Sequence, residues 1–247
     1  MQALGGKHTQ AGYADDFFTG LGATSVDFMD ASNYEGANVI HDLNQPIASP
    51  LMESYDCVFD GGTLEHVFNF PIALKNCMEL VRPGGHLIII TPWNNYAGHG
   101  FYQFSPELFY SALSAANGYA VEQMLIVKQN QWYAVANPRE VGARIELINS
   151  EPTLLFLIAE RVAGKPIFAT WPQQSDYSAM WSPGQSSPQP ASSSPSLKDA
   201  LLKKSGALQV LQQHWQARKS RKLCSVANRQ SFRPVTLADF SAVEPKR

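Results

Sequence analysis

The sequence is poor in cysteine, in net charge and in long apolar runs, and each shortage argues against a class of protein. Its three cysteines, Cys57, Cys77 and Cys224, are scattered. The first two lie in segments that we expect to be buried, so we expect a reducing, cytoplasmic setting rather than a disulfide framework. No run approaches the ~20 apolar residues of a membrane helix, and the first residues lack the pattern of a secretory signal. The net charge of −2 gives no overall reason to expect nucleic acid as a partner.

Two kinds of motif are also missing. The GxGxxG fingerprint of nicotinamide-dependent oxidoreductases occurs nowhere in the chain. The six histidines show no paired ligand spacing, so metal-dependent hydrolysis is disfavoured and no metal site is expected. What the chain does contain is 45% hydrophobic and 11% aromatic residues over 247 positions, which is enough for one full core and an appendage.

The stretch Tyr55–Thr91 reads as one strand–helix–strand unit. Cys57–Phe59 is a short apolar run followed by Asp60-Gly61-Gly62, which is typical of a buried parallel strand. Apolar residues then recur at helical spacing until Pro83-Gly84-Gly85 ends the helix, and His86–Thr91 forms a second apolar strand. Open α/β sheets bind ligands beyond the carboxyl ends of their strands, so the turn after the first strand is the expected binding region.

This unit also carries a resemblance to a known family. An acidic strand end, the loop Leu64-Glu65-His66-Val67, a helix, and then Arg82-Pro83-Gly84-Gly85-His86 with its apolar strand resemble the fourth and fifth strands of class I S-adenosylmethionine-dependent methyltransferases. The resemblance covers roughly residues 1–160. It implies an α/β fold with a Rossmann-like, mostly parallel sheet of order 3-2-1-4-5-7-6, flanking helices, and S-adenosyl-L-methionine as the cofactor. The runs 120–128 and 153–160 fit the antiparallel pair that ends the family's sheet.

Glycines supply the first candidate cofactor residues. Gly5 and Gly6 follow a very short apolar start and precede a helical pattern over residues 11–22, an order that lets a ligand approach backbone N–H groups at a helix start. The family's loop is usually richer in glycine, and a plain turn is the alternative interpretation. Gly61 and Gly62, together with Asp60, permit close backbone approach to a methionyl or adenosyl group.

Acidic residues end the second and third expected strands. Asp30, followed by Ala31, comes at the distance from the glycine pair that suits a carboxylate binding ribose hydroxyls. The alternative is that Asp30 caps the turn-prone stretch that follows it. In the family that the chain resembles, a pair such as Asp42-Leu43 flanks the adenine, with the acid meeting its amine and the apolar side chain packing on its ring. Without the resemblance Asp42 would be an ordinary loop acid.

Histidines supply the candidate catalytic residues. His66 and the preceding Glu65 are placed to reach the pocket, although Glu65 also suits a first-turn acid and His66 a packed histidine at a helix start. The loop 92–107 is aromatic and rich in amides, and residues 94–108 resemble a bacterial subgroup of the family often found among surface-polysaccharide genes. It places His99 between two glycines, where an imidazole that titrates near neutral pH suits a general base. Packing of the loop's aromatic residues as a lid is the structural alternative.

The sequence therefore predicts three parts: a methyltransferase-like domain (residues 1–168), a flexible linker rich in Pro and Ser (169–197), and a basic helical tail (198–247). Residues 198–247 hold 11 Lys and Arg against 3 Asp and Glu, whereas residues 1–197 hold 8 against 18. The tail suits a protein partner or an anionic surface, with a helix packed loosely on the body as the alternative.

The resemblance makes methyl transfer from S-adenosyl-L-methionine the leading hypothesis. The polar loop and the subgroup favour a small or glycan-like hydroxylated acceptor, for which the protein supplies alignment and a base. The alternative is a non-catalytic member of the fold, kept for binding or assembly. The short start and the reduced glycine loop favour that alternative.

Overall fold

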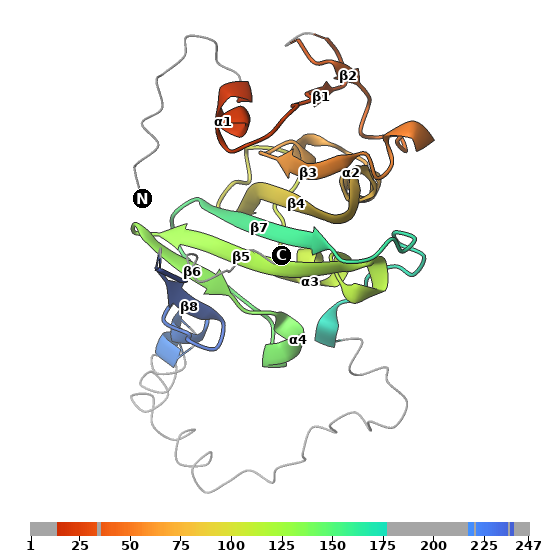
Figure 1. Ribbon diagram of the computed structural model, residues 1–247. Helices are drawn as coiled ribbons and strands as arrows, with labels where there is room; N and C mark the ends of the chain where they lie inside the picture. The colour runs from red at the N-terminus through yellow and green to blue at the C-terminus, as the bar shows by residue number, and fades with distance from the viewer. Residues whose placement is uncertain (1–13, 34–35, 177–216, 220, 237, 240–247) are drawn as a thin grey trace, which may run out of the picture.

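The computed structural model describes residues 14–33, 36–176, 217–219, 221–236 and 238–239. In these residues the chain is an α/β protein with a small two-stranded sheet and a larger sheet of six strands (Figure 1). The helices are α1 (Asp15–Gly20), α2 (Phe70–Leu80), α3 (Pro106–Ala112) and α4 (Pro138–Val141). The strands are β1 (Met29–Asp30), β2 (Val39–Ile40), β3 (Tyr55–Asp60), β4 (Val81–Asn94), β5 (Tyr119–Lys128), β6 (Gln131–Val135), β7 (Thr153–Arg161) and β8 (Phe232–Val235).

The larger sheet runs in the order β3-β4-β7-β5-β6-β8 and is mixed. Only β3 and β4 are parallel neighbours in it, and the other four pairs are antiparallel. The expectation of a mostly parallel sheet was therefore wrong for the described residues, because β6 and β8 extend the antiparallel side. β1 and β2 pair in parallel in a separate sheet. The full order 3-2-1-4-5-7-6 stays a prediction, since its first strand falls on residues 1–4, outside the described residues.

The strand–helix–strand unit forms β3, α2 and β4. The apolar side of α2 is buried, with Ala73, Leu74, Cys77 and Met78 at helical spacing in the core. Asn76 is buried beside them, and its amide binds the backbone of residues 43, 45 and 47. Buried polar groups need such partners, so this one side chain fastens the segment that follows β2 to the helix.

The edge position of β3 changes the expected environment of one cysteine. Cys77 is buried as predicted, but Cys57 is exposed, because no described strand pairs with the outer edge of β3. Burial raises the pKa of the Cys77 thiol far above its ordinary value. None of the three cysteines, all of which lie in the described residues, forms a disulfide, and the Cys224 thiol donates to the carboxylate of Glu146 at 3.1 Å.

β6 and β8 were not predicted. β6 is joined to β5 by Gln129 and Asn130, which both have positive φ (50° and 59°), as in a two-residue type I′ hairpin. β8 pairs antiparallel with β6 and comes from the range 198–247, so the expectation that this range is helical was wrong for residues 232–235. Most of the expected tail lies outside the described residues, and the three-part division stays a prediction.

The start of the expected linker is tied to the body of the protein. The backbone N–H and the hydroxyl of Ser175 both donate to the carboxylate of Glu107 in α3, at 2.8 Å each. Arg144 forms an ion pair with Asp176 at 2.7 Å. Residues 177–197 lie outside the described residues, so the predicted flexibility of the linker is untested there.

The amino end of β4 is organised around a buried arginine. Arg161, at the end of β7, donates to the carbonyl oxygens of Met78, Glu79 and Val81 and forms an ion pair with Glu53 at 2.7 Å. Helix ends leave carbonyl groups unpaired, and a cation there also complements the helix dipole. A surface hollow lined by Glu53, Glu79 and Arg161 lies here, at the opposite edge from the candidate site described next. Among the described residues, no helix is both long and apolar enough to cross a membrane.

Candidate functional site

The carboxyl end of β3 carries a buried acid. Asp60 is only 5% exposed; one of its oxygens accepts a hydrogen bond from the Thr63 N–H at 3.0 Å, and the other has no partner among the described residues. Burial raises the pKa of Asp60 to about 6; the bond from Thr63 opposes the rise and the nearby charge of Glu65 adds to it. Burying a carboxyl oxygen without a hydrogen-bond partner destabilises the folded chain, so a hydrogen-bond donor or a positive charge bound at this strand end would be stabilising.

The two glycines after Asp60 are required by their surroundings. A Cβ on Gly61 would lie 2.8 Å from the ring of Phe59. Gly62 has a φ of +111°, a conformation that other residues rarely adopt, and a Cβ there would lie 3.2 Å from a carboxylate oxygen of Glu65. The short helix η2 (Leu64–His66) begins shortly after this tight turn.

Glu65 connects η2 to the loop that follows β4. Its side chain is 1% exposed, and the Thr91 hydroxyl donates to its Oε2 at 3.1 Å. Its backbone carbonyl accepts hydrogen bonds from the N–H groups of Phe101 (2.9 Å) and Tyr102 (3.2 Å). The loop can pass this close because residue 100 is a glycine: a Cβ there would lie 2.9 Å from the Glu65 carbonyl oxygen and 3.1 Å from His66 Nδ1. Two loops far apart in sequence are thereby fixed against each other.

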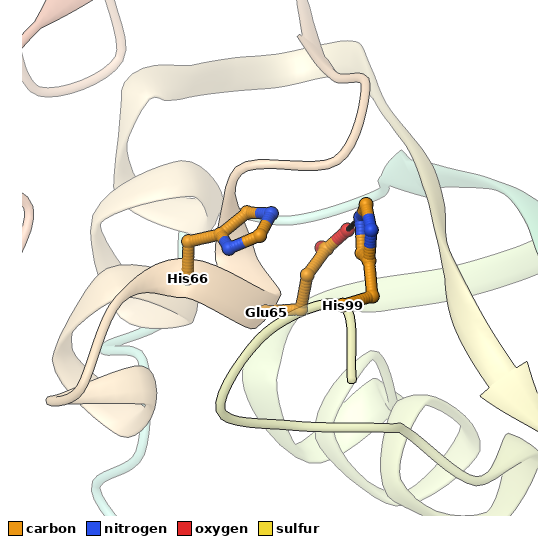
Figure 2. Close-up of side chains that lie close together, drawn as sticks. All are labelled: Glu65, His66 and His99. Atoms are coloured by element: carbon orange, nitrogen blue, oxygen red, sulfur yellow. Dashed lines mark ion pairs between the residues drawn. The ribbon is translucent and has the colours of Figure 1, made fainter. Parts of the chain in front are cut away.

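Figure 2 shows that Glu65, His66 and His99 point toward one another. The Nε2 of His99 lies 3.5 Å from Glu65 Oε1, and the two imidazole rings lie 4.9 Å apart, centre to centre. The ring of Tyr96 contacts His99 edge-on at 5.5 Å. His66 is exposed and the side chain of His99 is 48% exposed, so both rings are within reach of a ligand.

The pair Glu65–His99 has the parts of a base and its orienting acid. A carboxylate facing one ring nitrogen favours the proton on that nitrogen and leaves the other nitrogen as an acceptor. The sequence pointed to both residues separately but not to their contact. Thr91, which orients the carboxylate, was missed as a functional residue, and its only signal was its place at the end of an apolar strand.

The amides of the loop after β4 hold the loop itself. The Asn94 and Asn95 side chains donate to the backbone or side chain of residues 147–151, and Gln103 Oε1 accepts the Tyr96 N–H. These groups had suggested contacts to a hydroxylated acceptor, but in the structure they have internal partners. The lid interpretation expected Phe101 and Phe104 to be packed. Phe104 is buried in the core, as expected, but the interpretation was wrong for Phe101, which is 66% exposed.

The other predicted cofactor residues occupy local turns. Asp30 accepts the Ser32 N–H at 2.8 Å, as its turn-cap alternative predicted, and Asp42 accepts the Asn44 N–H at 2.9 Å. This bond lowers the pKa of Asp42. Asn44 in turn accepts the N–H of Asn69, which comes just before α2, so the Asp42 turn lies at the same end of α2 as η2.

The remaining candidates add less. Ala31 is exposed, and Leu43 is partly buried against the core rather than freely exposed. Gly5 and Gly6 lie outside the described residues. The convergence of all these residues on one cofactor therefore stays a prediction.

Neither the family models nor the curated proteins contain a match to this chain. Solved structures do match it. The antibiotic-resistance methyltransferase Kmr is 20% identical, with a TM-score of 0.31, over 51% of this chain and 62% of its own. A Bacillus halodurans C-125 protein classed provisionally as a methyltransferase is 11% identical (TM-score 0.36; 63% and 89% covered). A protein from the conversion of a disulfide into a thioacetal in echinomycin biosynthesis is 16% identical (TM-score 0.35; 61% and 71% covered).

Two of these three structures are described as methyltransferases, which is the class of protein that the sequence resembles. This chain spans about three fifths of the length of Kmr. Likenesses of this size leave the chemistry of the chain to be decided from its own residues.

The raised pKa of Asp60 predicts a specific dependence of stability on pH. Because the pKa is higher in the folded chain, the Asp60 contribution is fully present below about pH 3.8 and is lost as pH rises through about 6. A shift of this size corresponds to about 3 kcal/mol. Asp60→Asn removes the titration, so its free energy of unfolding relative to the unmodified protein should rise by about 2.5 kcal/mol between pH 4 and 7.5. Urea denaturation at both pH values measures it, and a difference independent of pH would contradict it.

Proposed function

We propose that this chain transfers a methyl group from S-adenosyl-L-methionine to a hydroxylated acceptor that is small or glycan-like. The observation that supports it most is the buried Asp60, one oxygen of which has no partner in the part of the chain that the structure describes, beside the charge of Glu65. It lies at the carboxyl end of a strand, where open α/β sheets commonly bind ligands. The methionyl part of the cofactor carries an ammonium group and a sulfonium, and these positive charges complement the carboxylates at this strand end. The candidate general base, His99, lies near this strand end with its carboxylate partner, Glu65.

The residues that would hold the cofactor follow from their places in the chain. Asp60, Gly61 and Gly62 would meet its methionyl end, because the glycine turn admits close backbone approach. Asp30 and Asp42, at the ends of paired strands β1 and β2, would meet the adenosine, with Ala31 and Leu43 beside them. Gly5 and Gly6 would complete the site in the family's arrangement.

When bound, S-adenosylmethionine would supply an electrophilic methyl group carried on a sulfonium leaving group. His99 takes the proton of the acceptor hydroxyl. Glu65 faces Nε2 of that ring, so Nδ1 is the nitrogen left to accept the proton. The buried carboxylate also stabilises the imidazolium that forms, and the Thr91 hydroxyl holds the carboxylate in this orientation. His66 lines the same space and positions the acceptor.

Cofactor binding tests the proposal before any acceptor is known. Calorimetry with S-adenosylmethionine should show binding with a Kd below about 1 mM, and Asp60→Asn should weaken it by about tenfold or more through the lost charged hydrogen bond. Asp56→Asn is the matched control, because Asp56 is exposed at the other end of the same strand. The absence of binding at millimolar S-adenosylmethionine would contradict the proposal.

That negative result would favour the second candidate, a non-catalytic protein that keeps the fold for binding or assembly. The reduced glycine pair, Gly5-Gly6, is the observation in its favour. The cytoplasmic setting, and contacts of the basic tail with a protein partner or an anionic surface, remain predictions under either function.

A further inference from the structure

The side chains that meet between η2 and the loop after β4 are all of types that can bind a metal ion (Figure 2). Glu65 offers a carboxylate oxygen, His66 and His99 each offer a ring nitrogen, and the three atoms lie within 4.8 Å of one another. Two imidazoles and one carboxylate hold zinc in catalytic sites, with a fourth position left open. We propose that Glu65, His66 and His99 bind a divalent transition metal, Zn²⁺ by the nature of the ligands.

The distances suit a tetrahedral ion. Ligand bonds of about 2.1 Å place neighbouring ligand atoms about 3.4 Å apart. Glu65 Oε1 and His99 Nε2 are 3.5 Å apart, so they need no rearrangement to share an ion. His66 needs to bring its nitrogen closer by up to about 1.4 Å, which a change of side-chain rotamer in this exposed residue can supply.

The surroundings hold the carboxylate in place for this purpose. The Thr91 hydroxyl engages Oε2 of Glu65, which leaves Oε1 facing His99. Hydrogen bonds of this kind to a ligating carboxylate orient it and tune its affinity. Gly100 lies against both the Glu65 carbonyl and the ring of His66, so the two loops keep the three ligands together.

The metal site goes beyond methyl transfer and does not depend on it. A neutral imidazole that binds a metal through Nε2 carries its proton on Nδ1, so Nδ1 has no lone pair left to accept another proton, and metal occupancy and base catalysis exclude each other on His99. No spacing along the chain indicated the site, because its ligands come from two separate loops, and the proposal runs against our expectation of no metal.

A second cluster of the same ligand types provides the control. His86, Glu122 and Glu160 lie on neighbouring strands β4, β5 and β7, and His86 Nε2 is 3.4 Å from Glu122. Neither of its carboxylates is buried, whereas Glu65 is 1% exposed. His86→Ala therefore removes the single histidine of this more exposed cluster without touching the proposed site.

The test is calorimetric titration of the full chain with Zn²⁺, without S-adenosylmethionine, and visible absorption of the Co²⁺-loaded protein as a report of coordination. We expect saturable binding by the unmodified protein and by His86→Ala. His66→Ala, His99→Ala and the isosteric Glu65→Gln should each weaken binding by ~100-fold or more, and Thr91→Val by ~10-fold. Circular dichroism confirms that each variant is folded.

Absence of saturable Zn²⁺ binding by the unmodified chain would overturn the proposal. Binding that survives all three ligand substitutions, or that is lost in His86→Ala, would overturn it as well, because the ion would then sit elsewhere. Each of these results is independent of cofactor binding, so failure of the metal site and failure of the methyl-transfer proposal are distinguishable.

Discussion

Phe232→Ala should lower the free energy of unfolding by about 3–5 kcal/mol, the usual cost of truncating a fully buried phenylalanine. Phe232 is the first residue of β8, is 0% exposed and stacks on Trp93 with ring centres 6.1 Å apart. The substitution removes this contact and leaves a cavity in the core beside Trp93. Urea denaturation followed by tryptophan fluorescence measures the loss.

Leu223→Ala is the matched control, because Leu223 comes from the same C-terminal segment and is 51% exposed. It should change the free energy of unfolding by less than about 1 kcal/mol. Equal effects of the two substitutions would contradict the assignment of β8 to the core. They would instead support the sequence-based view of residues 198–247 as an appendage.

His99→Ala should lower the kcat for methyl transfer by about 10²–10⁴-fold, the range typical of a lost general base. The affinity for S-adenosylmethionine should be unchanged, because the substitution removes the proton acceptor and leaves Asp60 and its glycine turn intact. The measurement is transfer of labelled methyl groups to the best substrate found in a panel of hydroxylated sugars, together with calorimetry of cofactor binding.

The Glu65→Gln variant tests whether His99 acts as a general base or only lines the pocket. The amide keeps the size of the side chain but loses the charge that stabilises the imidazolium, so kcat should fall while KM changes little. His86→Ala, remote from this pair, should leave the rate unchanged. A normal rate in His99→Ala would show that another group accepts the proton.

Local pattern predicted the centre of the fold well. The order strand, helix, strand was predicted correctly for β3, α2 and β4, but the expected burial of β3 was wrong, because Cys57 and Phe59 are exposed. The helix ends at Leu80, and Pro83-Gly84-Gly85 lies within the long strand β4, where the pairing with β3 shifts register. α3 starts at Pro106 as predicted but ends at Ala112, and a separate short helix, Ala115–Asn117, leads to Gly118, whose φ is +74°. A left-handed glycine of this kind ends a helical segment.

The missing strands had no local signal. β6 is half-buried along most of its length and shows little apolar alternation. β8 contains Pro234, which argues against an interior strand and is tolerated because β8 is the outermost strand of the described sheet. Each of the two is stabilised by pairing with a segment far away in the chain, and periodicity in a short window does not report such pairing.

The candidate site was predicted in its residues but not in its geometry. Glu65, His66 and His99 were all identified from their positions after strands, where loops commonly carry function. Their contact depends on the loop after β4 folding back onto the Glu65 carbonyl, and on a glycine at position 100. These are long-range constraints. Asp30 and Asp42, in contrast, showed the local turn bonds that their residue types favour.

The pairing of β8 with β6 also sets an order of assembly. Val135 and Phe232 are roughly a hundred residues apart in the chain, so closing that loop costs more entropy than forming the hairpin between β5 and β6. During synthesis, the outer edge of β6 has unpaired backbone groups until β8 has been made and can pair with it. An unpaired edge is a template for aggregation, so translation stalled between these two strands would leave the nascent chain in its most vulnerable state.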